Sequence, residues 1–349
     1  MPDELSTLLA PVPLPPDGRF EQYKIDKLLG QGGMGVVASA FDPKLRRHVA
    51  IKIMKPELAQ SDASRAMFLA EARAIAALNH ENVVSVYEVG QAMGLPFFAM
   101  ELLQGTSLAE MLAAKHRFTD VQTLKLALQL CDGLGAAHDR GIVHRDIKPA
   151  NVFLEMPRGR VKLLDFGLAR SAFESDVLSV LAGTPGYMSP EQARDEPTDR
   201  RSDVYSLGAL LYRLLAGRLP LEDETVSGVL AQLLTRRAPP LADARPDLPV
   251  ELCDVVDRCL SPEREQRPGS VAEIRGQLAS VVGALGTSTP VAGVSAAQRT
   301  VEHAEGGREL RVSRPTVAWS PSEWSVSRCC HRRPWLLVDW SRACGGFTG

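Results

Sequence analysis

Apolar and polar positions alternate along residues 20–281 in segments of strand and helix length, with few long gaps between them. Apolar residues before and after a glycine-rich stretch at 30–35 predict the two strands of a hairpin. Residues 49–54 (VAIKIM) form a short apolar run that is typical of a buried strand. Residues 123–139 carry apolar side chains at helical spacing and predict a helix that ends at Gly141. The pattern therefore predicts a domain that contains both strands and helices.

Two charged residues interrupt these apolar patterns. Lys52 lies inside the predicted strand 49–54, where a buried ammonium needs an anionic partner or a phosphate. On a helix over residues 62–78, Met67, Ala74 and Leu78 fall on one narrow apolar stripe, and Glu71 falls in its middle. We therefore expect Glu71 to point inward and to pair with Lys52. The alternatives are a lysine that reaches the surface along its own stem and a glutamate that is solvated on a loosely packed helix.

The two ends of the chain differ from its middle. Residues 1–19 are rich in proline and predict an extended linker. After Gly283 small residues dominate, so we expect residues 282–349 to form a linker and a disordered tail. All four tryptophans lie in this tail, at positions 319, 324, 335 and 340. The alternative for the tail is a segment around 335–338 (WLLV) that binds a partner or a membrane surface.

Composition and charge narrow the function classes. Of 349 residues, 45% are apolar and 23% are charged, which are ordinary values for a globular protein. A net charge of −2 gives no general electrostatic case for binding nucleic acid or an anionic membrane. No run of about 18 apolar residues exists, so we expect no transmembrane helix, and the acidic N-terminus argues against a secretion signal. The six cysteines form no Cys-x-x-Cys pair, which favours a reducing, cytoplasmic compartment over a zinc site or a disulfide framework.

The glycine-rich stretch has the composition of a phosphate-binding loop. Glycines at positions 30, 32 and 35 let backbone N–H groups approach phosphate oxygens with no Cβ in the way. A strand follows the loop where a dinucleotide-binding fingerprint would open a helix, so a Rossmann-type site is not expected. Leu29 and Val37 flank the loop and would cover one face of an adenine ring. Taken alone, the loop is equally compatible with a plain flexible hairpin tip.

Residues 144–151 (HRDIKPAN) and 165–167 (DFG) concentrate the side chains that phosphoryl transfer requires. Asp146 is a candidate base, Lys148 a cation, Asn151 a neutral metal ligand and Asp165 an anionic one. The apolar runs 152–154 and 161–164, separated by a turn at 157–159, predict a hairpin that brings Asn151 and Asp165 together. Such hard oxygen ligands suit Mg²⁺ that is held jointly with substrate phosphates. We expect His144 to be a hydrogen-bonded structural residue rather than a base.

These motifs, in this order, resemble those of the eukaryotic-type (Hanks-type) serine/threonine protein kinases. The resemblance covers residues 20–281, and residues 183–192 (GTPGYMSPEQ) are most similar to bacterial members. It implies an α+β, two-lobed protein-kinase-like fold, with a small β-rich N-lobe over about 20–102 and a larger, mainly helical C-lobe over about 103–281. It further implies that ATP binds between the lobes and that Asn151 and Asp165 bind Mg²⁺.

The resemblance also implies a role for each matching residue. Asp146 would be the catalytic base, and Lys148 would lie near the transferred phosphate. Lys52 would contact the α- and β-phosphates while Glu71 holds it in place. The nucleotide would contact the glycine-rich loop, the strands beside it and the segment between the lobes: Leu29, Gly30, Gln31, Gly32, Gly33, Met34, Gly35, Val37, Ala50, Lys52, Met100 as the gatekeeper, Glu101, Leu103 and Phe153.

Two further matches concern the C-lobe. Glu191 would pair with Arg267, as the resemblance implies for the residues at these positions. Asp203 opens the run 204–211 (VYSLGALL), which predicts a helix that is apolar on nearly all sides and therefore buried. That helix resembles the central hydrophobic helix of the family.

The sequence departs from the family pattern at two places. Ser189 stands where the family usually has alanine, which is a mild change. The loop 167–183 contains no threonine and offers serines only at positions 171, 175 and 179. We predict an activating phosphate on Ser175 or Ser179, where it would pair with Arg145 and order the loop.

The leading hypothesis is a serine/threonine protein kinase that uses ATP and Mg²⁺, phosphorylates protein substrates, phosphorylates itself and acts in signalling. Lys148 two residues after Asp146, with Thr184 downstream, resembles the serine/threonine pattern rather than the tyrosine pattern. A dimer for trans-autophosphorylation is compatible with this hypothesis. The alternative is a catalytically silent pseudokinase scaffold that binds nucleotide, although the strand lysine, the base and both metal ligands are present. A small-molecule phosphotransferase is a third hypothesis, disfavoured by residues 183–191, which resemble a platform for an extended peptide.

Overall fold

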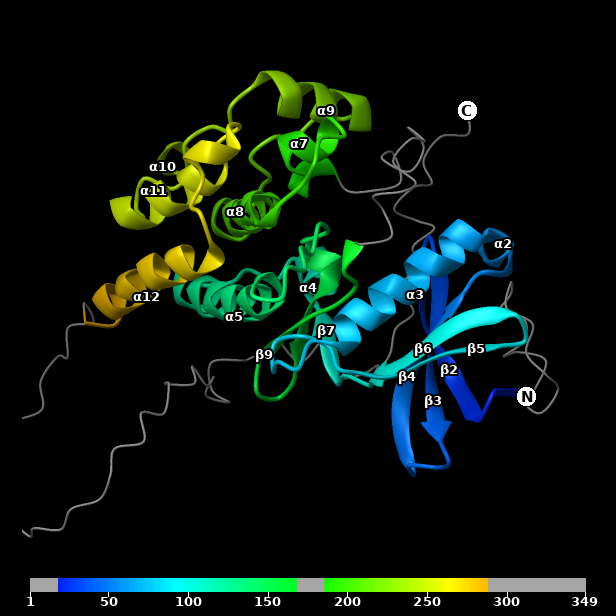
Figure 1. The fold of residues 1–349 in the computed structure, drawn as a ribbon. Helices are drawn as coiled ribbons and strands as arrows, with labels where there is room; N and C mark the ends of the chain where they lie inside the picture. Colours follow the sequence, from blue (N-terminus) through cyan, green and yellow to red (C-terminus); the bar gives the residue numbers. More distant parts are fainter. Residues whose placement is uncertain (1–17, 168–184, 288–349) are drawn as a thin grey trace, which may run out of the picture.

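The computed structural model describes residues 18–167 and 185–287, which form two lobes (Figure 1). The N-lobe contains an antiparallel sheet with the strand order β1-β2-β3-β4-β6-β5. Its strands are β1 (Arg19–Phe20), β2 (Tyr23–Gln31), β3 (Gly35–Asp42), β4 (Arg47–Met54), β5 (Val86–Ala92) and β6 (Leu95–Glu101). Two helices follow β4, namely α2 (Pro56–Ala59) and α3 (Asp62–Ala76), and α3 packs against β5 and β6.

The C-lobe is mainly helical. Its longer helices are α5 (Asp120–His138), α8 (Arg200–Ala216), α9 (Val226–Thr235), α11 (Val250–Cys259) and α12 (Val271–Thr287). Shorter elements are α4 (Leu108–Ala113), α7 (Pro190–Ala193), α10 (Leu241–Ala244) and the 3₁₀ turns η1 (Pro149–Asn151), η3 (Pro185–Tyr187) and η4 (Arg264–Gln266). A small antiparallel sheet of β7 (Gly105–Ser107), β8 (Val152–Glu155) and β9 (Arg160–Leu163) lies where this lobe meets the N-lobe (Figure 1). The α+β, two-lobed architecture expected from the sequence is confirmed.

Three apolar clusters stabilise the two lobes and the contact between them. The first fills the N-lobe between the sheet and α3, and includes Phe20 and Phe97, whose rings meet edge to face at 5.5 Å. The second fills the C-lobe around α8, which buries residues on all its faces, as its apolar sequence predicts. The third joins the lobes: Ile75 of α3, Val83, Ala137 of α5 and Phe166 are all buried in it. Because Phe166 follows Asp165 directly, this third cluster fixes the backbone on which Asp165 is carried.

Several elements agree with the sequence pattern, and the start of one helix differs. The hairpin β2–β3, the strand β4 and the hairpin β8–β9 form where they were predicted. The helix α5 begins at Asp120, three residues before the expected start, because Thr119 and Gln122 form a capping box. It ends as expected before Gly141, which has a φ of 72°. The helix α12 continues to Thr287, beyond the expected domain edge at residue 281.

The predicted apolar stripe of the helix 62–78 is wrong in detail. Met67 and Ala74 are only partly buried, whereas Phe68, Ala72 and Ile75 are buried. The difference arises because α3 faces both the sheet and the cluster between the lobes, so its buried face is wider than one stripe. Glu71 lies at the edge of this wider face and is buried, as expected. Within the described ranges, no helix combines the length and apolarity needed to cross a membrane, and Cys131, Cys253 and Cys259 are buried free thiols.

Candidate active site

Lys52 lies between two carboxylates that come from different parts of the chain. Its side chain extends from β4, and its Nζ is 2.7 Å from Oδ1 of Asp165 and 3.6 Å from Oε1 of Glu71. Lys52 and Glu71 are almost fully buried, whereas the Asp165 side chain is 44% exposed. The expected pair with Glu71 is confirmed, but the shorter contact is the one to Asp165, which the sequence did not predict. It joins the N-lobe sheet to the residue that follows β9.

Burial and charge act in opposite directions on this group. Burial alone would lower the pKa of Lys52, but Asp165 and Glu71 outweigh it and raise that pKa, so the ammonium stays charged. Burial raises the pKa of Glu71 to about 7, since the attraction of Lys52 does not fully offset it and Asp165 repels a second negative charge. When Glu71 is ionised, the two carboxylates around one ammonium leave a surplus of negative charge. The group therefore favours an additional cation next to Asp165.

The glycine-rich loop contains glycines of two kinds. A Cβ added to Gly35 would lie 2.5 Å from the carbonyl oxygen of Ile53, so packing within the N-lobe requires glycine there. A Cβ added to Gly30 or Gly33 would meet no atom within 4 Å, and neither residue has the left-handed backbone that favours glycine. Gly32 is similarly open, with its nearest contact at 3.9 Å. At these three positions, packing and backbone conformation do not explain glycine, whereas close approach of a ligand to the backbone does.

The residues expected around an adenine ring share one face of the sheet. Residues directly opposite one another in an antiparallel pair point to the same side, as do alternate residues of one strand. Val37 lies opposite Lys52, and Ala50 lies opposite Met100, two positions along β4 from Lys52. Leu29, Gln31 and Met34 complete the hairpin above this face, and Leu103 and Phe153 lie on the C-lobe side. The register thus places Val37, Ala50 and Met100 on the face of the sheet that carries Lys52.

The catalytic-segment residues form a compact hydrogen-bonded group. Nζ of Lys148 is 2.8 Å from Oδ2 of Asp146. Nδ2 of Asn151 donates to the same Oδ2 and to the backbone oxygen of Asp146, both at 2.8 Å. Because the amide nitrogen of Asn151 is used in this way, its amide oxygen is the atom that remains for a metal. All three residues lie on the short segment that leads into β8.

This group and Asp165 lie side by side. The backbone N–H of Leu164 donates to the oxygen of Asn151 at 2.9 Å, and that of Gly167 donates to the oxygen of His144 at 2.7 Å. A Cβ added to Gly167 would be only 2.9 Å from Cβ of Asp146. The hairpin β8–β9 therefore brings its two polar ends together, as its pattern predicts. Asp165 itself has a positive φ of 33°, an uncommon conformation that such cross-links maintain.

The donor set around Asn151 and Asp165 fits Mg²⁺. Both offer hard oxygen atoms, and the surplus negative charge next to Asp165 favours a cation. Throughout residues 18–167 and 185–287, no three histidine, cysteine or acidic side chains gather as a self-sufficient metal cluster. A Mg²⁺ ion at this position would take its other ligands from nucleotide phosphates and water, as this ion commonly does.

A buried aspartate, Asp203, holds the backbone of the catalytic segment. It lies in the first turn of α8 and is fully buried. Its carboxylate accepts the backbone N–H groups of His144 at 2.8 Å and Arg145 at 2.7 Å, and Nε2 of His138 at 2.7 Å. Sequence reasoning noted this residue only as the start of a helix. The signal was available, since an acid that opens an otherwise apolar, buried helix must find donors inside the protein.

His144 has the structural role that its sequence context predicts. It is fully buried, its ring lies 4.4 Å from that of Phe166, and its Nε2 donates to the oxygen of Leu164 at 2.9 Å. Burial lowers the pKa of His144, so it stays neutral near neutral pH. Its contacts join the catalytic segment to the segment that carries Asp165.

A second pair that sequence reasoning missed connects the segment between the lobes to β9. Nζ of Lys162 is 2.6 Å from Oε1 of Glu101 and also donates to the oxygen of Val83. The same Oε1 accepts the backbone N–H of Ser85 at 2.8 Å. Glu101 was expected only to contact the nucleotide, yet its side chain also fixes the link between the lobes. No local pattern marks this pair, because its members are 61 residues apart.

The C-lobe side of the site is braced by a buried ion pair. The guanidinium of Arg267 donates to both carboxylate oxygens of Glu191, at 2.7 and 2.9 Å, which confirms the expected pair. Ser189 is fully buried, and its hydroxyl donates to Gln192 in a capping box, so a polar residue is accommodated where the family usually has alanine. Nε2 of Gln192 donates to the oxygen of Arg145 at 2.8 Å. The helix α7, which Ser189 caps, is thus hydrogen-bonded directly to the catalytic segment.

The predicted activating phosphosites, Ser175 and Ser179, and also Thr184, lie outside the described residues. Their pairing with Arg145 therefore stays a prediction. Arg145 itself has a φ of 64°, and the N–H of its Nε is buried with no partner among the described residues.

Comparison with known proteins gives a consistent result. Residues 23–277 match the protein kinase domain family. The chain is 36% identical over 272 residues to the serine/threonine-protein kinase pkn3 of Myxococcus xanthus, covering 74% of this chain and 50% of that protein. It is 35% identical over 274 residues to the serine/threonine-protein kinase PknB of Mycobacterium tuberculosis, covering 76% of this chain and 44% of that protein. The chain thus spans about half the length of the curated relatives it matches.

Solved structures agree with these matches. The crystal structure of the Mycobacterium tuberculosis PknI kinase domain superposes with a TM-score of 0.63 and 28% identity, covering 77% of this chain and 100% of that domain. The fold, the order of the motifs and the family match all concern the same residues. The chain belongs to the protein kinase domain family.

Proposed function

We propose that this protein transfers the γ-phosphoryl group of ATP to serine or threonine hydroxyls of proteins. The single observation that carries the proposal is the meeting of Lys52, Asp165 and the group formed by Asp146, Lys148 and Asn151, which come from separate segments of both lobes. A positive charge, oxygen ligands for a metal and a carboxylate in one place are what phosphoryl transfer requires. The named relatives, which are serine/threonine-protein kinases, support the same reaction.

The proposed nucleotide site uses the face of the N-lobe sheet. The adenine ring would lie against Val37 and Ala50 from above and Phe153 from below, with Met100 behind it. Glu101 would contribute its backbone oxygen, since its backbone N–H already donates to Ser85. Gly30, Gly32 and Gly33 would let the backbone approach the phosphates, and Lys52 would neutralise part of their charge.

The proposed transfer step needs little covalent participation by the protein. Asp146 would accept a hydrogen bond from the attacking hydroxyl and then its proton, as the new O–P bond forms, the bond from the γ-phosphorus to the bridging oxygen breaks and ADP leaves. Lys148, already paired with Asp146, would face the charge on the transferred group. Asn151 and Asp165 would hold Mg²⁺, which when bound supplies charge neutralisation to the phosphate oxygens. Asp203 would keep Asp146 in position through the backbone of the preceding residues.

Transfer to a generic basic protein tests this proposal. The full chain is incubated with ATP and Mg²⁺, and phosphate incorporation is compared among wild type, Asp146→Ala and Lys52→Met. Lys44→Met, at an exposed position of the N-lobe, and Asp62→Ala, whose side chain is 91% exposed, serve as matched controls. We expect activity in wild type and both controls and a large loss in the two site variants. If wild type transfers no more than Asp146→Ala under several divalent metals while still binding nucleotide, the pseudokinase scaffold is correct instead.

The finer features of the function are also proposals. We propose that the protein phosphorylates itself on serine or threonine, in trans within a dimer, and that it acts in signalling. Mass spectrometry of the full chain after incubation with ATP identifies the modified residues. At protein concentrations too low to saturate the dimer, an initial rate of autophosphorylation that rises with the square of protein concentration supports the trans reaction, whereas a first-order dependence contradicts it.

A further inference from the structure

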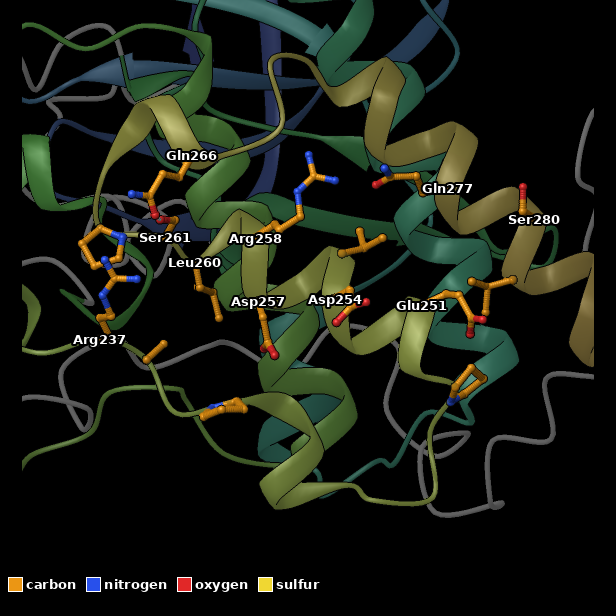
Figure 2. Close-up of a pocket in the computed structure, with 16 residues that line it drawn as sticks. Arg237, Glu251, Asp254, Asp257, Arg258, Leu260, Ser261, Gln266, Gln277 and Ser280 are labelled. Carbon is orange, nitrogen blue, oxygen red and sulfur yellow. The ribbon is translucent and has the colours of Figure 1, made fainter.

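A groove of about 950 Å³ opens on the C-lobe between α11 and α12, and none of its lining residues belongs to the candidate active site (Figure 2). Its floor includes the buried apolar residues Val255, Leu260 and Val281. Figure 2 shows Glu251, Asp254 and Asp257 along α11, with Gln277 and Ser280 on the facing helix α12. The proposed phosphoryl transfer uses none of these residues, so the groove needs an explanation of its own.

The groove has an uncompensated negative charge. Glu251, Asp254 and Asp257 follow one another at i, i+3 and i+6, which places them on one side of α11. Its two arginines are already neutralised, because Arg258 pairs with Glu273 at 2.6 Å and Arg237 pairs with Glu263 at 2.9 Å. Both of those glutamates lie outside the lining. Among the described residues, no cation pairs with Glu251 or Asp254, so the groove favours a basic ligand.

The groove also contains an acceptor that lacks a donor. Oε1 of Gln277 is buried and has no hydrogen-bond partner within the part of the chain that the structure describes. A buried acceptor without a donor is costly, since it has lost its water and gained nothing in return. The ligand that fits the groove therefore combines positive charge, apolar side chains and at least one N–H donor.

One segment of this chain has that combination. Residues 332–338 read RRPWLLV and contain two arginines, an indole N–H and three aliphatic side chains, with no acid. They lie beyond Thr287, the last residue of α12, and α12 itself forms one wall of the groove. The helix rises roughly 15 Å from Gln277 to Thr287. A flexible chain of the length of residues 288–331 has an end-to-end distance of roughly 35 Å, which is sufficient to return to the groove.

We propose that residues 332–338 dock in this groove of the same molecule. Trp335 would lie against Val255 and Leu260 and donate its indole N–H to Oε1 of Gln277. Arg332 and Arg333 would face Glu251 and Asp254. Because a tethered segment has an effective concentration of about a millimolar, a contact whose dissociation constant lies well below that value would be mostly closed.

Tryptophan fluorescence of the full chain tests the docking. All tryptophans lie after residue 318, so the emission reports on this region alone. Replacing Trp319, Trp324 and Trp340 by phenylalanine leaves Trp335 as the single reporter. We expect Trp335 to emit at a shorter wavelength than free indole and to resist quenching by acrylamide. The measurement is made on a background of Asp146→Asn, so its outcome does not depend on the proposed activity.

Charge reversal identifies the groove as the binding site. Glu251→Lys combined with Asp254→Lys should shift the emission of Trp335 to longer wavelength and expose it to acrylamide. The matched control is Asp62→Lys on α3, which should change neither property. Glu251 and Asp254 are exposed, so their replacement leaves the core intact. A full swap, in which Arg332 and Arg333 are also changed to glutamate, should restore the shielded emission.

Three results would overturn the proposal. The first is a Trp335 that is quenched as freely as indole, or whose emission ignores the two lysine substitutions. The second is a shift that appears only as protein concentration rises, since that result assigns the groove to the tail of a second copy. The third is a shift that requires vesicles containing phosphatidylserine, since that result assigns the segment to a membrane surface.

Discussion

The two sides of the candidate active site are built in opposite ways. On the N-lobe side, Gly32 and Gly33 are exposed, and the turn is held by the bonds of Gly32 to Gly35 and of Lys55 to Met34. On the C-lobe side, the backbone before Asp146 is held from inside the protein by Asp203, a carboxylate that no solvent reaches. A proton acceptor must be in place before its substrate arrives, whereas a phosphate cradle can close around its ligand. The structure therefore places internal hydrogen bonds where the proposed reaction needs a fixed backbone.

Replacing the candidate base should produce the largest effect on the rate of phosphoryl transfer. It should also distinguish the role of the C-lobe side from that of the N-lobe side. Asp146→Asn keeps the shape of the side chain and an oxygen for Asn151 but removes the negative charge. We expect the rate of phosphoryl transfer to fall about 10²- to 10⁴-fold, the usual contribution of a general base. Steady-state kinetics and calorimetric titration with nucleotide check this, and the affinity for nucleotide should hardly change. A variant that lost nucleotide binding instead would show that Asp146 serves the N-lobe side as well.

Removing the internal support should produce the largest loss of stability. Asp203→Ala leaves two backbone N–H groups and His138 without their acceptor. We expect the free energy of unfolding to fall by about 3–5 kcal/mol, because three buried donors lose their acceptor and each such loss costs about 1–3 kcal/mol. Urea denaturation measures it, with Asp62→Ala as the exposed control. A loss below about 1 kcal/mol would mean that water replaces the carboxylate and that the C-lobe side is less rigid than its hydrogen bonds indicate.

Features that arise from local sequence patterns could be predicted, whereas features that depend on how distant segments meet could not. The glycine-rich loop, the strand of Lys52 and the hairpin β8–β9 follow from local patterns, and all three form as expected. The pairing of Lys52 with Glu71 was predicted because a buried charge needs a partner and a nearby helix offered one. The shorter contact of Lys52, to Asp165, spans 113 positions. It depends on how the lobes meet, and no local pattern contains that information.

The expectations that the structure corrected or extended have a similar cause. The stripe predicted for α3 assumed one apolar neighbour, whereas the helix contacts both the sheet and the cluster between the lobes. Asp203 was visible in the sequence, but its three donors come from α5 and the catalytic segment, which only tertiary structure brings together. The predicted domain boundaries at residues 20 and 281, the phosphosites and the roles of the site residues stay predictions, which the experiments above can decide.

Within the glycine-rich loop, two substitutions should behave differently. Gly35→Ala places a Cβ 2.5 Å from the oxygen of Ile53 and should lower the free energy of unfolding by about 1–3 kcal/mol, the usual cost of overpacking. Gly33→Ala meets no protein atom and should leave stability unchanged while raising the KM for ATP. Thermal denaturation and steady-state kinetics of both variants measure this difference. If Gly33→Ala destabilised the protein as much as Gly35→Ala, the loop would be held by packing after all.

The smallest expected effect is a pH dependence of stability that Glu191 produces on the C-lobe side of the site. Burial would raise the pKa of Glu191, but the hydrogen bonds and charge of Arg267 and the hydroxyl of Ser202 outweigh it and hold that pKa below its ordinary value of 4.5. A carboxyl whose pKa is lower in the folded state contributes stability above its unfolded value, and this contribution is lost as the pH falls through the folded value. Wild type should therefore exceed Glu191→Gln by about 1 kcal/mol near neutral pH, the difference between a charged and a neutral hydrogen bond. The two proteins should converge in acid, as urea denaturation across this range can measure. Glu263→Gln, a half-exposed acid of the same lobe, is the control that should follow wild type at every pH. If the free energies of unfolding of wild type and Glu191→Gln differed by a constant amount at every pH, the shape of the side chain, rather than its charge, would stabilise this side of the site.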